Sequence, residues 1–215
     1  MKFYNIGLTN NLNVIGHYPQ TVRIEGYHVD FVNNVKADYF PDYLPKYGLK
    51  LNSSSKPTDV IDRGILTFGF VISEKLKIIL SKFKLPPHKF YSIEVAGSSS
   101  NYYWFHYISN MEKFINFEKS EIEVFETLPP FNVEETLSLS FDEILKLKSD
   151  LIMKRGRSLR YKVIQLNNSF PDYDLFEITG AQNITLISET LKKEFINNGI
   201  TGFEISEFIN LKKII

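Results

Sequence analysis

Residues 72–77 read ISEKLK and residues 187–192 read ISETLK, so the two hexapeptides differ only in Lys75 against Thr190. Each is entered by a short apolar run, LTFGFVI in the first copy and NITLI in the second. Short apolar runs bounded by polar or turn residues are typical of buried strands. The doubled phrase therefore predicts two strand-to-helix transitions in one chain, 115 positions apart.

The Ser-Glu pair in each copy has the pattern of a helix start. The hydroxyls of Ser73 and Ser188 can each accept a hydrogen bond from an otherwise unpaired amide of the first helical turn. Glu74 and Glu189 follow at the position where a negative charge complements the helix dipole. A duplicated catalytic pair is the alternative interpretation. The helix start accounts for every feature, so we expect these four residues to act as structural caps.

The segments around the two copies favour an α+β fold. Apolar residues at spacings of three and four follow each Ser-Glu pair, and strand-like alternation resumes in KFYSIEV and in TGFEIS. Ser140 and Glu143 fit a capping box, although Leu145 and Leu147 alternate as in a strand. We expect mixed, mostly antiparallel sheets with a few amphipathic helices and two related strand–helix–strand units. Residues 1–215 would form one domain, with related sub-units dividing near residue 110.

Composition limits the functional classes. Lys plus Arg and Asp plus Glu number 25 each, so no overall charge directs the chain to nucleic acid or to an anionic membrane. The chain has no Cys, which excludes disulfides and a Cys nucleophile. It begins without an apolar signal segment and has no run long enough to span a bilayer. We expect a cytoplasmic protein whose partners are recognised by local surfaces.

Charge is segregated locally. Residues 112–135 contain seven Glu, and residues 146–162 contain seven Lys or Arg. One interpretation is that the two stretches balance one another across the fold as solvated faces. The other is that the acidic stretch contacts a basic partner. The acidic residues that we select as candidate contacts are Glu118, Glu121, Glu123 and Glu126.

The stretch YYWFHY at 102–107 is aromatic on both faces of a strand, with Tyr102, Trp104 and His106 on one face. Burial on both sides is one interpretation. The other is a half-exposed strand whose rings anchor a partner, because Tyr and Trp give a large contact area at low entropic cost. We therefore add these three residues to the candidate partner-binding set.

Motifs for catalysis and cofactors are not evident. The four His residues lack the spacing of a helical zinc pair, and GSSSN at 97–101 lacks the context of a nucleophile elbow. No Walker or dinucleotide-binding spacing occurs. We expect neither a metal nor another cofactor, and no catalytic residue is assigned.

Several of these segments resemble one family. A strand entering Ser-Glu-x-Leu-Lys, then KFYSIEV and NYYWFHYIS, and the ending DLFEI with LISETLKKEFINNGITGFEIS are similar to bacterial immunity proteins of polymorphic toxin systems, formerly labelled as a domain of unknown function. The resemblance covers residues 66–110 and 160–206, and residues 1–60 show none. It implies an antitoxin-like protein that binds and neutralises a cognate toxin, and it implies no catalytic residue.

Three hypotheses follow from the sequence. The first is an immunity protein that occludes the active site of a cognate protein toxin. The second is a small cytoplasmic enzyme, a hydrolase or transferase that uses carboxylates such as Asp59, Asp62 or Asp142. The third is an interaction module whose aromatic residues bury a homo-oligomeric interface.

Overall fold

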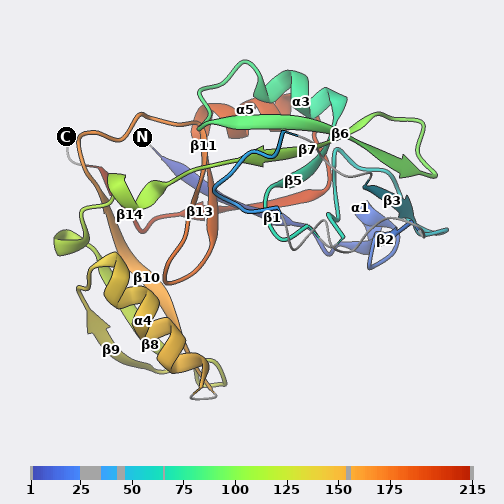
Figure 1. Ribbon diagram of the computed structural model, residues 1–215. Coiled ribbons are helices and arrows are strands. Elements are labelled where there is room, and N and C mark those ends of the chain that lie inside the picture. The colour runs from blue at the N-terminus through green and yellow to red at the C-terminus, as the bar shows by residue number, and fades with distance from the viewer. Residues whose placement is uncertain (1, 25–34, 43–46, 65, 154–155, 214–215) are drawn as a thin grey trace. The chain divides into compact units, whose positions relative to one another are not determined.

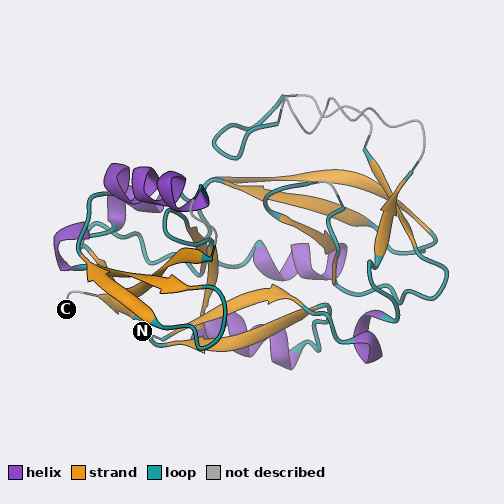
Figure 2. Ribbon diagram, turned by 90° about the horizontal axis from the view of Figure 1, so that it is seen from below, coloured by secondary structure: helices purple, strands orange, loops and turns teal. Residues whose placement is uncertain are grey.

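The computed structural model describes residues 2–24, 35–42, 47–64, 66–153 and 156–213. It has the expected α+β class, with mostly antiparallel sheets (Figures 1 and 2). The chain divides into two compact units, both discontinuous in sequence. Unit 1 comprises residues 1–5, 110–189 and 206–215, and unit 2 comprises residues 6–109 and 190–205. The sequence interpretation had placed a simple division near residue 110.

Unit 2 contains a six-stranded sheet. Its order is β2 (Thr21–Arg23), β3 (Gly48–Leu51), β6 (His88–Ala96), β7 (Tyr102–Tyr107), β5 (Phe70–Ser73) and β4 (Val60–Ile61). The β3–β6 pair is parallel and the other neighbours are antiparallel. Strands β7 and β6 are therefore interior strands. Two helices of this unit are α1 (Leu12–Ile15) and α3 (Glu74–Leu80).

Unit 1 contains a second sheet, in the order β14 (Leu211–Lys213), β10 (Arg157–Leu166), β8 (Glu121–Glu126) and β9 (Val133–Leu137). Helix α4 (Phe141–Ile152) follows β9, and the 3₁₀ helices η1 (Met111–Phe114) and η2 (Phe117–Lys119) precede β8. Ile144 and Leu151 of α4 share a buried core with Ile122 and Val124 of β8. The predicted helix at Ser140 is confirmed, because a full capping box joins Ser140 and Glu143.

A third sheet has the order β11 (Leu175–Ile178), β12 (Ile184–Ser188), β1 (Phe3–Leu8) and β13 (Phe203–Phe208). The chain passes from one unit to the other within β1 and again within β13. Helix α5 (Glu189–Asn197) follows β12 directly. Most of α5 belongs to unit 2, where Lys75 Nζ of α3 donates to the carbonyl oxygen of Asn198 at 2.6 Å.

Both predicted helix starts are present. Ser73 is the N-cap of α3, and its hydroxyl accepts from the amide of Leu76 at 3.2 Å. Ser188 immediately precedes α5, with Glu189 in the first turn. The strand before each helix pairs in the same antiparallel register, Val60 opposite Ile72 in one copy and Leu175 opposite Ile187 in the other. The repeat is therefore a hairpin and a helix, longer than the hexapeptide that reveals it.

Candidate functional site

The aromatic strand β7 lies inside unit 2. Trp104 is 1% exposed and His106 is 0% exposed, and Tyr102 is equally buried. The Tyr102 hydroxyl donates to the carbonyl of Thr58 at 2.7 Å, and Trp104 Nε1 donates to the carbonyl of Phe68 at 3.1 Å. The expectation of a half-exposed aromatic strand is wrong, because β7 is paired on both edges and its rings pack into the core. These three side chains offer no surface to a partner.

His106 sits in an aromatic enclosure. Its ring is stacked on Trp104, with centroids 4.8 Å apart and planes 13° apart, and the rings of Phe40 and Phe68 lie within 5 Å. Nε2 lies 3.2 Å from the carbonyl oxygen of Ala37, and Nδ1 is buried without a hydrogen-bond partner among the described residues. A carbonyl only accepts, so the neutral ring carries its proton on Nε2. Burial lowers the pKa of His106.

The acidic and basic stretches meet across β8 and β10. Arg160 is directly opposite Glu123, and Nε donates to the carboxylate at 2.8 Å. Lys162 Nζ lies 3.2 Å from Glu121, and Arg157 donates to Glu134 of β9 at 2.7 Å. Such cross-strand pairs fix register more than they stabilise, because exposed pairs are worth about 0 to 1 kcal/mol each. The interpretation of balancing faces is supported for Glu121 and Glu123.

The two other acids of the predicted contact set are Glu118 and Glu126, and Glu135 of the same acidic stretch was not in that set. Glu118 is exposed in η2, and Glu126 ends β8 half-buried, where it accepts from Nδ2 of Asn132 at 3.1 Å. Glu135 is exposed on β9. Within the described chain no ion pair is formed by these three carboxylates.

The loop that joins β8 to β9 exposes a group of apolar side chains that the sequence interpretation did not select. Leu128 is 68% exposed, Phe131 52% and Val133 43%, and Pro129 and Pro130 lie between them. We call these five residues the hairpin tip. Leu128, Pro129 and Pro130 of the tip line an open hollow of about 530 Å³, and its polar lining includes Glu126, Glu134 and Arg157. An apolar centre with a charged rim is the usual anatomy of a protein interface.

Phe131 has an unusual backbone. Its φ of 59° is in the left-handed region, which is costly for a bulky side chain. Its amide donates to the carbonyl of Leu128 at 2.9 Å and closes the turn. An exposed phenyl ring in a strained conformation contributes little to folding. Strain of this kind is concentrated at functional sites.

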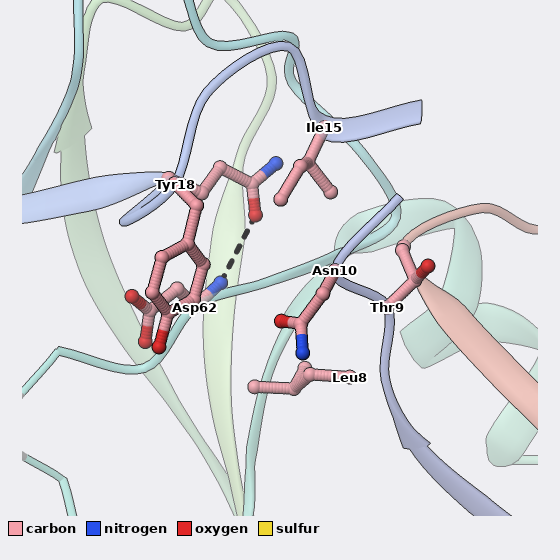
Figure 3. Close-up of a pocket in the computed structure, with 8 residues that line it drawn as sticks. Leu8, Thr9, Asn10, Ile15, Tyr18 and Asp62 are labelled. Atoms are coloured by element: carbon pink, nitrogen blue, oxygen red, sulfur yellow. Dashed lines mark hydrogen bonds between the residues drawn. The ribbon is translucent and has the colours of Figure 1, made fainter. Parts of the chain in front are cut away.

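A second feature is a small cavity in unit 2, about 110 Å³ in volume (Figure 3). Side chains from the end of β1, from the segment around α1 and from the loop after β4 line it. The lining residues are Leu8, Thr9, Asn10, Ile15, Tyr18, Gln20, Asp62 and Gly202. Asp62 is the sole carboxylate among these eight residues.

The three carboxylates considered for catalysis are not assembled into one site. Asp59 accepts hydrogen bonds from Ser73 and Thr201, which is a structural role. Asp142 lies in the first turn of α4, in unit 1. Asp62 alone lines the cavity. General acid–base chemistry by paired carboxylates is thus not provided by the described lining of this cavity.

Neither a comparison with protein-family models nor a search of curated proteins finds a match to this chain. Among the described residues, none of the helices is both long and apolar enough to span a membrane. The same part of the chain contains no cluster of three or more His, Asp or Glu side chains suited to a metal ion.

The sequence contained one overlooked signal for the hairpin tip. TLPPFN at 127–132 places two prolines and two large apolar residues in what the flanking strands make a loop. Apolar residues in a loop cannot all be buried, so this composition favours an exposed apolar group. The cavity had no such signal, because its lining comes from four separate segments.

Proposed function

We propose that this protein is an immunity protein, which binds a cognate bacterial toxin and neutralises it by occluding the toxin's active site. The observation that carries the proposal is the hairpin tip, an exposed apolar group at the end of the β8–β9 hairpin. The resemblance of the two helix-start motifs to bacterial immunity proteins supports the same function. The binding surface is in unit 1, and the buried aromatic strand β7 is part of the scaffold.

The chemistry of the tip indicates the chemistry of its partner. Leu128 and Phe131 are of the size that fills an apolar pocket on a partner, as interface anchors do. Glu118, Glu126 and Glu135 carry negative charge that no described cation neutralises. Complementary charge accelerates association and favours a correctly charged partner. A toxin with a basic surface around its active site fits these properties.

The proposal is tested by co-expression with the toxin encoded next to this protein. Wild-type protein should restore growth and co-purify with the toxin. A Leu128→Ser/Phe131→Ser double variant should lose both properties, because two interface anchors together contribute on the order of 2 to 4 kcal/mol or more. Ile78→Ser is the matched control, since Ile78 is an exposed apolar residue on α3.

The outcomes separate the competing hypotheses. Rescue by wild type and by Ile78→Ser but not by the tip variant supports the proposal. Growth that wild-type protein does not restore, with no complex recovered, contradicts it. In a third outcome, the sedimentation coefficient of the wild-type protein alone rises with concentration and that of the tip variant does not. The tip then joins two copies of this chain, and the immunity function is wrong.

A further inference from the structure

The cavity of unit 2 is a preformed recess. The amide of Thr9 donates to the carbonyl of Gly202 at 3.2 Å, and the Thr9 hydroxyl donates to Glu204 at 2.7 Å. On the opposite wall, the amide of Asp62 donates to Oε1 of Gln20 at 3.1 Å, the bond drawn in Figure 3. The buried Gln20 amide nitrogen donates to Lys56 and Thr58. The lining segments are therefore held in place by hydrogen bonds within the chain.

Polar groups with unused hydrogen-bonding capacity line this recess. One oxygen of the Asp62 carboxylate accepts from the amide of Gly64 at 3.1 Å, and no described Lys, Arg or His forms an ion pair with Asp62. The Tyr18 hydroxyl and the Asn10 amide make no hydrogen bond to another described residue. Figure 3 draws the Tyr18 ring and Asp62 on one side of the lining and Asn10 on the other.

The remaining walls are apolar. Ile15 is buried and Leu8 partly exposed, while the Tyr18 side chain is 64% exposed and forms an aromatic edge. A complementary ligand needs a positive charge for Asp62, several N–H donors for Asn10 and Tyr18, and an apolar stem for Ile15 and Leu8. The exposed face of the Tyr18 ring would add a cation–π contact.

The size of the recess admits such a group. Its volume of about 110 Å³ is enough for a guanidinium group with one or two methylenes. Guanidinium also matches the donors required, because its planar fork presents five N–H groups and pairs with carboxylates in a bidentate manner.

We propose that this cavity binds an alkylguanidinium group, either as free arginine-like metabolite or as an arginine side chain of a partner protein. Asp62 supplies the counter-charge, Tyr18 and Asn10 supply the remaining polar contacts, and Ile15 and Leu8 contact the stem. This site is in unit 2, so it is distinct from the hairpin tip of unit 1. It needs no toxin to be tested.

The test is an amide NMR titration of the full chain with ethylguanidinium, with ethylurea as its uncharged isostere. Ethylguanidinium should produce saturable shifts at the amides of Gly64 and Gly202 by about 20 mM, because a millimolar site is filled at that concentration. Ethylurea should produce none. A pentapeptide with a central arginine, against its citrulline counterpart, separates the two sources: binding of the free cation but not of the peptide indicates a metabolite site.

Two variants make the result decisive. Asp62→Asn keeps the acceptor for the Gly64 amide and removes the charge, so affinity for ethylguanidinium should fall about tenfold or more. Asp38→Asn makes the same change of charge at an exposed position away from the cavity lining and should leave the affinity unchanged. Equal shifts with ethylurea, or an Asp62→Asn variant that binds as well as wild type, would overturn the proposal.

Discussion

The hydroxyl of Ser73 donates a hydrogen bond to Oδ1 of Asp59 at 2.8 Å, and the amide of Ser73 donates to the carbonyl of Asp59 at the same distance. The second copy of the repeat contains the same relationship. Ser188 donates to Oδ1 of Asp174 at 2.6 Å through its hydroxyl, and to the carbonyl of Asp174 at 2.8 Å through its amide. Each helix start is thus bonded to the residue that immediately precedes the first strand of its own hairpin.

This relationship extends the repeat. The acid stands 14 residues before the serine in each copy, so it belongs to the repeated unit although the intervening sequences differ. Ser73 has two roles, because its oxygen accepts from the amide of Leu76 at the helix start while its hydroxyl proton is donated to Asp59. The paired residues that resemble a catalytic motif are accounted for by folding. This supports an old duplication of a hairpin–helix unit.

Replacing Ser73 by Ala should reduce the free energy of unfolding by about 1 to 2 kcal/mol, because the variant loses an N-cap and a charge-assisted hydrogen bond. Asp59→Ala should cost more, since Asp59 also accepts from the amide and hydroxyl of Thr201 through its other oxygen. Urea denaturation followed by circular dichroism measures both. Ser100→Ala, in an exposed loop, is the control. An Asp59→Ala variant as stable as wild type would show that this network is not structural.

Gly202 should be far less tolerant of substitution than Gly199. Both have positive φ, 98° and 57°. A Cβ at Gly199 would meet nothing, whereas one at Gly202 would overlap the carbonyl oxygen of Val60 and lie 2.8 Å from the hydroxyl of Thr58. We expect Gly199→Ala to cost about 1 kcal/mol and Gly202→Ala about 3 kcal/mol or more. Thermal unfolding compares the two variants, and equal melting temperatures would refute the difference.

A substitution at Phe131 should stabilise the protein, in contrast to the substitutions above. Asparagine tolerates the left-handed conformation better than phenylalanine does, so Phe131→Asn should stabilise the fold by about 0.5 to 1 kcal/mol. Phe131→Leu keeps the strain and should give no gain. The same Phe131→Asn variant should bind the toxin more weakly. A variant that is destabilised, measured by its urea midpoint, would show that the ring supports the hairpin and is not held there for a partner.

Local chemistry made some elements predictable. The hydroxyls of Ser73 and Ser140 meet amides within three residues, so the cap can be recognised in a short window of sequence. The balance of the acidic and basic stretches was also an open interpretation, and the register of β8 on β10 supports it. The caps depend on residue type and spacing alone, whereas the charge balance was settled only by that strand pairing.

Burial of β7 could not be decided in the same way. A strand that is aromatic on both faces can be an interior strand or an interfacial one, and the difference depends on β6 and β5, which pair with it from other parts of the chain. The discontinuous units are equally non-local, since residues 1–5 and 206–215 join 110–189. The exposure of Leu128 and the assembly of the cavity lining around Asp62 likewise depend on tertiary structure.

His106 should make the stability of the protein depend on pH. Burial is the main reason that its pKa in the folded protein is lowered, and the positive charge of Lys89, its neighbour on β6, acts in the same direction, while the hydrogen bond to Ala37 opposes both. Ala37 and Phe40, which contact the His106 ring, lie in residues 35–42. The charged side chains of that segment are Lys36, Asp38 and Asp42. In the unfolded chain the imidazole has its ordinary pKa of about 6.5.

As the pH falls, His106 is therefore protonated at a higher pH in the unfolded chain than in the folded protein. The contribution of His106 to stability is complete above a pH of about 6.5, and it declines as the pH falls toward the lowered pKa of the folded state. His106→Phe keeps the aromatic packing and removes the titration. Between about pH 7.5 and pH 5.5 the urea midpoint of this variant should fall less than that of wild type.

The fluorescence of Trp104 reports the protonation of His106 directly. It is the single tryptophan of the chain, and His106 is stacked on it. A protonated imidazole quenches a stacked indole, so native-state fluorescence should stay constant down to a pH well below the ordinary histidine range and fall only there. His17→Gln, an exposed histidine, should leave this profile unchanged. If fluorescence instead falls near a pH of about 6.5, or His106→Phe keeps the wild-type profile, the enclosure does not hold His106 neutral.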